Sequence, residues 1–394
     1  VQSECVTLWN ITAYTSPNTV FSGVRVSEYN VLYCKLLRKN GRLLTSNADT
    51  LTVFSYGRAG LWVEGCHFES ALDDVMQPEG FKCAIDSLVD DHRLKVRGLK
   101  LEAVPDAVLP GDTLLLFNAR EAAPLWEGKV ASVDPKNNLI AFAGKLPDRG
   151  IIPVDVKNGG DLTLLYNKDA STAFFVIRSN TFSNTIGNTL VSHVPKAGGI
   201  FEGNILVNTT MGVNFANHAS WTYYAGYPKE IYLRIASNAQ ALGPNLYPDP
   251  PVFTENILIR GNQFIGGYAS PKTYKENMGA VSFFLYGGAW KLPARTIGYS
   301  NLAITRNQFL RHPGKYAVRI HNASSVLIED NHFDTGLASE YAGAFAAEER
   351  FAIGLAYSSD IEIRGNKTSD PKSLLFVGED VQRVQGPGPS PSGK

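Results

Sequence analysis

The sequence predicts an all-β protein built as a right-handed parallel β-helix, with an antiparallel β-barrel-like unit inserted into it. Two observations carry this prediction: a recurring motif centred on asparagine, and a segment, 94–166, that lacks the motif. A unit of this length cannot bury its own apolar face and must stack on the next unit.

The motif reads apolar, any, apolar, any, any, Asn, any, apolar. Its asparagines lie 24 residues apart from Asn180 to Asn204 and again from Asn307 to Asn331. Alternating apolar residues predict short strands with one buried face. Asparagines at one corner of successive coils, ~4.8 Å apart, can pair their side-chain amides as a ladder. The copies are FVIRSNTF ending at Phe182, ILIRGNQF ending at Phe264, LAITRNQF ending at Phe309 and VLIEDNHF ending at Phe333, with weaker copies through Asn204 and Asn366.

Cysteine replaces asparagine near the N-terminus. LWVEGCHF carries Cys66 at the Asn position, and Cys34 lies 24 residues after Asn10. We expect Cys34 and Cys66 to occupy the same stack as small apolar substitutes. The four cysteines lack CxxC spacing, so a zinc site is not expected, and we interpret them as buried free thiols.

The segment without the motif contains LKVRGLKLEA, DTLLLF, GKVASV, NNLIAFAG and DLTLLY, separated by PGD, DPKNN and PDRG turns. Short alternating strands with tight turns predict an antiparallel barrel-like insertion. We therefore divide the chain into N-terminal coils over 1–93, the insertion over 94–166, C-terminal coils over 167–380 and a disordered tail over 381–394. The composition of the last stretch, GPGPSPSGK, suggests disorder.

Composition excludes several classes of partner. Basic and acidic residues balance at 37 each, and no basic run occurs, so we expect neither nucleic acid nor an anionic membrane as partner. No stretch of about 18 apolar residues predicts a transmembrane helix. The N-terminal VQSECVTLWN lacks the segments of a signal peptide and suggests a chain cut from a longer one.

Three carboxylates stand out. Asp73 and Asp74 are adjacent in ESALDDVMQPEG, and Asp49 lies 24 residues before Asp73. One coil's separation places Asp49 and Asp73 on neighbouring rungs, roughly 5 Å apart plus any offset. Carboxylates this close repel, so we expect at least one raised pKa, and a glycosidase needs one protonated acid and one ionised base. Capping of a turn's backbone N–H groups and calcium binding are the two alternatives.

Further candidates surround these acids in the sequence. Arg58, in YGRAG, belongs to the same coils and is a candidate to pair with an acid and to bind substrate. Trp221 and Tyr223, in SWTYYAGY, have faces that stack on sugar C–H groups. His193 and Arg234 are candidates to hydrogen-bond sugar hydroxyls. For each, packing or hydrogen bonding within the fold is the alternative interpretation.

The runs NITAYTSP and NADTLTVFSYGRAGLWVEGCHFESALDDV resemble glycoside hydrolase family 110. The resemblance covers residues 1–333 and is strongest over the N-terminal coils. It implies a β-helix with a barrel-like insertion that acts as an inverting, metal-independent exo-α-1,3-galactosidase. It also implies that Asp49, Asp73 and Asp74 are catalytic, that the partner is a glycan ending in α-galactose, and that no cofactor is used. A secreted or periplasmic location follows from this substrate class.

Two other functions stay open. One is a different β-helical polysaccharide hydrolase or lyase of the pectin type, although the chain lacks the Gly-His-Gly and Arg-Ile-Lys segments of polygalacturonases, and its neutral charge counts against a lyase. The other is a non-catalytic β-helical carbohydrate-binding module. The sequence predicts no oligomeric state.

Overall fold

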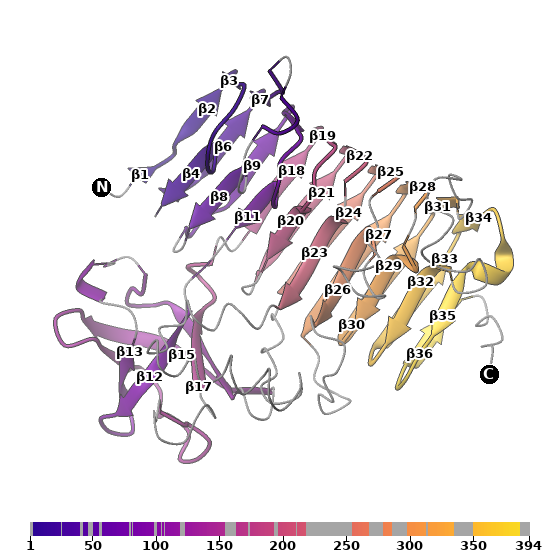
Figure 1. Ribbon diagram of the computed structural model, residues 1–394. Coiled ribbons are helices and arrows are strands. Elements are labelled where there is room, and N and C mark those ends of the chain that lie inside the picture. The colour runs from indigo at the N-terminus through magenta and orange to yellow at the C-terminus, as the bar shows by residue number, and fades with distance from the viewer. Residues whose placement is uncertain are drawn as a thin grey trace, which may run out of the picture.

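The computed structural model forms a parallel β-helix with a closed antiparallel barrel, drawn below the N-terminal coils in Figure 1. The predicted fold class is confirmed. The structure describes residues 3–24, 26–39, 42–45, 50–54, 57–78, 80, 82–97, 101–103, 105, 107–118, 123–153, 163–171, 174–192, 196–209, 211–217, 254–267, 279–285, 298–312, 314–334 and 350–386.

Each coil of the β-helix contributes one strand in turn to three parallel sheets. The first sheet contains β2 (Thr7–Trp9), β6 (Tyr29–Leu32), β9 (Leu61–Glu64), β18 (Phe174–Arg178), β21 (Gly198–Glu202), β24 (Thr254–Arg260), β27 (Tyr299–Thr305), β30 (Ala323–Glu329), β33 (Ser359–Arg364) and β36 (Gln382–Gln385). The second contains β3 (Thr12–Ala13), β7 (Lys35–Leu36), β10 (His67–Glu69), β19 (Thr181–Ser183), β22 (Ile205–Val207), β25 (Gln263–Ile265), β28 (Gln308–Leu310), β31 (His332–Asp334) and β34 (Lys367–Thr368). The third contains β4 (Phe21–Val24), β8 (Leu51–Phe54), β11 (Met76–Pro78), β20 (Asn188–Ser192), β23 (Met211–Asn217), β26 (Val281–Leu285), β29 (Tyr316–His321), β32 (Phe351–Ala356) and β35 (Leu375–Val377). A short pair, β1 (Ser3–Glu4) with β5 (Val26–Ser27), lies at the N-terminal end.

The asparagines of the motif form the expected ladder at the corner between the first and second sheets. The Asn262 Oδ1 accepts from the Asn204 backbone N at 2.9 Å and from its Nδ2 at 3.0 Å. The Asn262 Nδ2 in turn donates to the Asn307 Oδ1 and to the Phe201 carbonyl, both at 2.9 Å. Each buried amide is thus satisfied by its neighbours. The same pattern joins Asn180, Asn204, Asn262, Asn307, Asn331 and Asn366.

The final apolar residue of the motif stacks in the same register. The rings of Phe264 and Phe309 lie 4.8 Å apart between centroids, and those of Phe309 and Phe333 lie 4.9 Å apart. All three side chains are buried. Because parallel register places like residues of successive coils side by side, one sequence position builds one continuous aromatic column in the core.

Cysteines continue the ladder toward the N-terminus, as expected. The Cys66 backbone N donates to the Asn180 Oδ1 at 2.8 Å, and the Cys34 N donates to the Cys66 Sγ at 3.3 Å. Burial raises the pKa of Cys66 to about 12. All four cysteines are free, but Cys5 is exposed and not buried. It lies outside the ladder, between β1 and β2, where its thiol donates to Glu28 at 2.7 Å.

The inserted unit is a closed barrel with the strand order β12-β13-β16-β15-β14-β17, every described pair being antiparallel. Its strands are β12 (Lys82–Leu88), β13 (Arg93–Arg97), β14 (Thr113–Asn118), β15 (Ala123–Asp134), β16 (Leu139–Phe142) and β17 (Thr163–Asn167). The barrel therefore begins at Lys82, ahead of the expected boundary at 94. Cys83 and Ile85 alternate into the barrel core, and β12 pairs with β17, a partner distant in the sequence.

The C-terminal end also differs from expectation. Strand β36 lies inside the range 381–394 that was expected to be disordered, and Val384 in it pairs with Ile361 of β33. Val384 packs against the core as a partly buried side chain, which is enough to add one more strand to the open edge of the first sheet. Residues 387–394 lie outside the described part of the chain.

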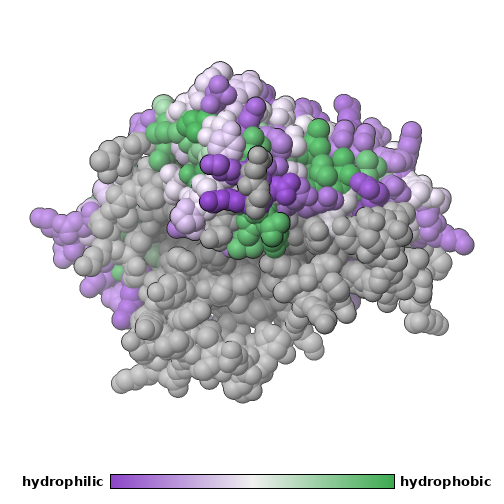
Figure 2. Space-filling model, turned by 45° about the horizontal axis from the view of Figure 1, so that its top comes forward, coloured by the Kyte–Doolittle hydropathy of each residue, from purple (hydrophilic) through white to green (hydrophobic). Residues whose placement is uncertain are grey.

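The described outer surface shown in Figure 2 mixes hydrophilic and hydrophobic patches. On the first sheet, neighbouring coils are joined by ion pairs: Arg178 with Glu64 at 3.1 Å, Arg260 with Glu202 at 2.5 Å and Arg364 with Glu329 at 2.6 Å. Among the described residues the helices are the short η1 (Leu101–Ala103) and η5 (Pro371–Ser373), and none of the described helices has the length and apolar character to cross a bilayer.

Candidate functional site

The acid pair lies in the connection from the second sheet to the third, between β10 and β11. Ala71 and Val75 bury their side chains on either side of it, whereas Asp73 is exposed and Asp74 is half-buried. Adjacent side chains diverge on a straight strand, so a turn is needed for both to reach one flank. The barrel follows β11, so the acids lie at the end of β11 that is away from the barrel.

Asp74 is held by the next coil. Its Oδ1 accepts from the backbone N and from the Nδ2 of Asn188, both at 2.7 Å. The Val75 N donates back to the Asn188 carbonyl at 2.7 Å, which fixes the two coils against each other. Hydrogen bonds donated to a carboxylate are charge-assisted and stabilise its ionised form. Asp73 accepts, through Oδ1, from the Asp74 N at 3.0 Å.

Gly187 lets the coils approach closely at this point. A Cβ on Gly187 would lie 2.5 Å from the Asp73 carbonyl carbon, 2.5 Å from the Asp74 N and 2.7 Å from the Asp73 carbonyl oxygen. These are backbone atoms, so no side-chain rotation relieves the contact. The position of the acid pair therefore depends on the absence of a side chain at residue 187.

We expect Gly187→Ala to lower the free energy of unfolding by about 2–3 kcal/mol, because the added methyl must push two packed backbones apart. Chemical denaturation of both proteins measures the difference. Gly144→Ala is the matched control, since the nearest atom to a Cβ there is the Trp126 ring at 4.0 Å. Equal unfolding midpoints for Gly187→Ala and Gly144→Ala would contradict the close approach.

Arg58 has a different partner from the one expected. It lies in the connection after β8, at the opposite end of the third sheet from the acid pair. Its Nη1 and Nη2 donate to the two carboxylate oxygens of Asp112 in the barrel, at 2.6 and 2.8 Å. The expected pairing with Asp73 or Asp74 is thus replaced by a bidentate pair between β-helix and barrel. Its binding of substrate stays a prediction.

Asp112 is built to receive that guanidinium. It is 5% exposed and also accepts from the Leu109 N and the Asn167 Nδ2, both at 2.7 Å. Burial alone would raise the pKa of Asp112, but the hydrogen bonds from Arg58, Leu109 and Asn167 hold it below its ordinary value. This buried pair fixes the barrel to the coils that precede it.

The other predicted site residues, Asp49, His193, Trp221, Tyr223 and Arg234, lie outside the described residues. The close triad of carboxylates is therefore not tested. Within the part of the chain that the structure describes, no group of three or more His, Cys, Asp or Glu side chains could hold a metal ion. The calcium interpretation thus has no described ligand set.

The structure adds two residues to the site, Asn188 and Gly187. Both follow the barrel in the sequence, and Asn188 lies 114 residues from the carboxylate it binds. A signal was present, because β20, which begins at Asn188, occupies the third sheet in the coil after β11. Recognising it requires knowing where the barrel returns the chain to the β-helix.

Comparison with known proteins gives one distant relative in sequence. No family model matches the chain. Over 316 residues the chain is 22% identical to alpha-1,3-galactosidase B of Akkermansia muciniphila, a match that covers 75% of this chain. The chain spans 36% of the length of that relative.

Two solved structures illustrate the structural similarity. The tailspike protein gp49 of Pseudomonas phage LKA1 has 8% identity and a TM-score of 0.27, over 82% of this chain and 55% of that one. The mannuronan C-5 epimerase AlgE6 A-module of Azotobacter vinelandii has 9% identity and a TM-score of 0.28, over 95% of this chain and 76% of that one. The chain is thus a parallel β-helix with a distant sequence similarity to one alpha-1,3-galactosidase.

Proposed function

We propose that this protein is a carbohydrate-active β-helix that removes terminal α-linked galactose from glycans by an inverting mechanism. The observation that carries the proposal is the Asp73–Asp74 pair at the entry to the third sheet, with Asp74 oriented by two hydrogen bonds from Asn188. The similarity to an alpha-1,3-galactosidase supports galactose as the sugar.

In this proposal Asp74 is the general base. The two donated hydrogen bonds favour its carboxylate form and fix its orientation, as a base that activates water requires. Water attacks the anomeric carbon from the face opposite the leaving group, and a second carboxylic acid protonates the leaving oxygen. Asp73 and Asp49 are the two candidates for that acid, and single Asn variants distinguish them.

A second candidate function is a non-catalytic carbohydrate-binding module. It is favoured by the same contacts, because a carboxylate that accepts from the next coil and an Asp that accepts from the following N–H are also the bonds of a structural turn. This alternative predicts that the protein binds sugar and hydrolyses none, with or without Asp74.

The test is incubation of the protein with 4-nitrophenyl α-galactoside and with Galα1-3Gal, followed by proton NMR. We expect galactose to appear first as the β-anomer, because inversion converts the α-linkage into a β-hemiacetal. Release of the α-anomer first would overturn the inverting mechanism. Silence on both substrates, with binding retained, would favour the binding module.

A further inference from the structure

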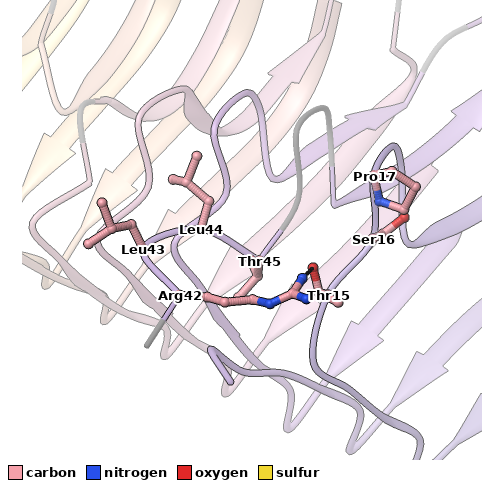
Figure 3. Close-up of a pocket in the computed structure, with 7 residues that line it drawn as sticks. All are labelled: Thr15, Ser16, Pro17, Arg42, Leu43, Leu44 and Thr45. Atoms are coloured by element: carbon pink, nitrogen blue, oxygen red, sulfur yellow. Dashed lines mark hydrogen bonds between the residues drawn. The ribbon is translucent and has the colours of Figure 1, made fainter. Parts of the chain in front are cut away.

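A hollow of about 540 Å³ opens on the β-helix among the connections of the first coils (Figure 3). One wall comes from the connection between β3 and β4, and the other from the connection between β7 and β8. Its volume falls in the range of about 300–1,000 Å³ that is usual for small-molecule sites. The lining residues are Thr15, Ser16, Pro17, Arg42, Leu43, Leu44 and Thr45.

The hollow lies on the same flank as the acid pair. Both of its walls are connections from the second sheet to the third, and Asp73 and Asp74 occupy the corresponding connection of the next coil. Direct bonds join them: the Ser16 N donates to the Thr45 carbonyl at 2.8 Å, and the Thr45 N donates to the Ser70 carbonyl at 3.0 Å. Since successive coils are ~4.8 Å apart, the hollow begins about one rung from the acid pair.

Arg42 supplies oriented donors to this hollow. Its Nη1 donates to the Thr15 Oγ1 at 3.0 Å, as the dashed line in Figure 3 shows. Within the described part of the chain this is the one hydrogen bond made by its guanidinium, which carries five N–H donors in a planar fork. Donors held in one orientation suit the hydroxyl oxygens of a sugar ring.

Apolar and hydroxyl groups complete the lining. Leu43 is 83% exposed, and Leu44 and Pro17 also line the hollow, so C–H surface is available beside the guanidinium. Ser16 and Thr45 supply the polar groups of the opposite side. A saccharide has the matching character, with hydroxyls around its edge and C–H groups on its faces.

We propose that this hollow is a subsite for the sugar residues on the leaving-group side of the scissile bond. This inference rests on the proposed function, in which the acid pair cleaves the terminal galactose. The next sugar residues then extend along the flank toward the N-terminal coils, with Arg42 donating to hydroxyl oxygens and Leu43 packing on a ring face.

The experiment compares a substrate that reaches the hollow with one that does not. Kinetics are measured on the trisaccharide Galα1-3Galβ1-4GlcNAc and on 4-nitrophenyl α-galactoside, for the unaltered protein, Arg42→Ala and Leu43→Ser. We expect Arg42→Ala to raise KM for the trisaccharide about tenfold, the factor that one lost charge-assisted hydrogen bond of ~1.4 kcal/mol produces. KM for the aryl galactoside should stay unchanged.

Leu43→Ser tests the apolar wall without touching the core, because that side chain is already exposed. Arg149→Ala, an exposed arginine on the barrel, is the matched charge control. Unchanged kinetics on the trisaccharide for Arg42→Ala and Leu43→Ser, or equal losses on both substrates, would overturn the subsite.

Failure of the proposed function is distinguished by direct binding. If neither substrate is hydrolysed, saturation-transfer NMR compares the trisaccharide with free galactose. Binding of the trisaccharide that Arg42→Ala weakens and Arg149→Ala leaves intact supports the subsite independently of catalysis. Binding that is insensitive to Arg42→Ala overturns it.

Discussion

Replacing Asp74 with asparagine is expected to reduce kcat for α-galactoside hydrolysis by roughly 10³-fold, within the range of 10²–10⁴ that a general base contributes. The fold should persist, because the Asn Oδ1 can still accept the two bonds from Asn188 that the carboxylate accepts now. The variant loses its basicity and keeps its place between the coils. Rates of galactose release and thermal unfolding, measured together, check both parts.

Asp148→Asn is the matched control for this change. Its side chain is 79% exposed on the barrel and pairs with Lys145 at 3.1 Å, so the same chemical change occurs far from the acid pair. An Asp74→Asn protein that keeps its rate would reject Asp74 as the base. A protein that loses both rate and stability would instead support the structural turn.

Asn262→Ala is expected to lower the free energy of unfolding by about 3 kcal/mol or more. The change strands the Asn204 backbone N, the Asn204 Nδ2 and the Phe201 carbonyl in the buried ladder, and each unsatisfied group costs about 1–3 kcal/mol. It also interrupts the ladder in its middle, where neighbouring coils depend on one another. Urea unfolding monitored by tryptophan fluorescence measures the loss.

Asn262→Cys provides the comparison that the chain itself suggests. Cys66 already occupies a rung, where its Sγ accepts from the Cys34 N and its backbone N donates to the Asn180 Oδ1. A thiol at position 262 should therefore cost less stability than alanine, because it keeps an acceptor for the Asn204 N. Equal losses for the two variants would show that the ladder's hydrogen bonds contribute little to stability.

The β-helix itself was predictable because its information is local and repeated. Each copy of the motif carries the strand alternation, the ladder asparagine and the core phenylalanine within eight residues. Parallel register then places equal positions on top of one another, so one coil determines its neighbour. The same logic identified Cys34 and Cys66 as rungs and drew attention to Asp73 and Asp74.

The partners of the site were decided by tertiary structure. Asp74 meets Asn188 and Gly187 because the barrel leaves and re-enters the β-helix within one coil, which no local pattern encodes. Arg58 binds Asp112, and not an acid of its own flank, because the closed barrel brings a buried carboxylate to the corner after β8.

The boundaries have the same origin. Strand β12 joined the barrel at Lys82 because β17, far along the sequence, was available to pair with it. Strand β36 formed at Gln382–Gln385 because β33 offered an open edge and a place for Val384. The sequence by itself determined the coil, its ladder and its carboxylates, whose signals repeat at short range. The tertiary structure decided which distant residue each of them meets, because those contacts depend on where an insertion returns the chain.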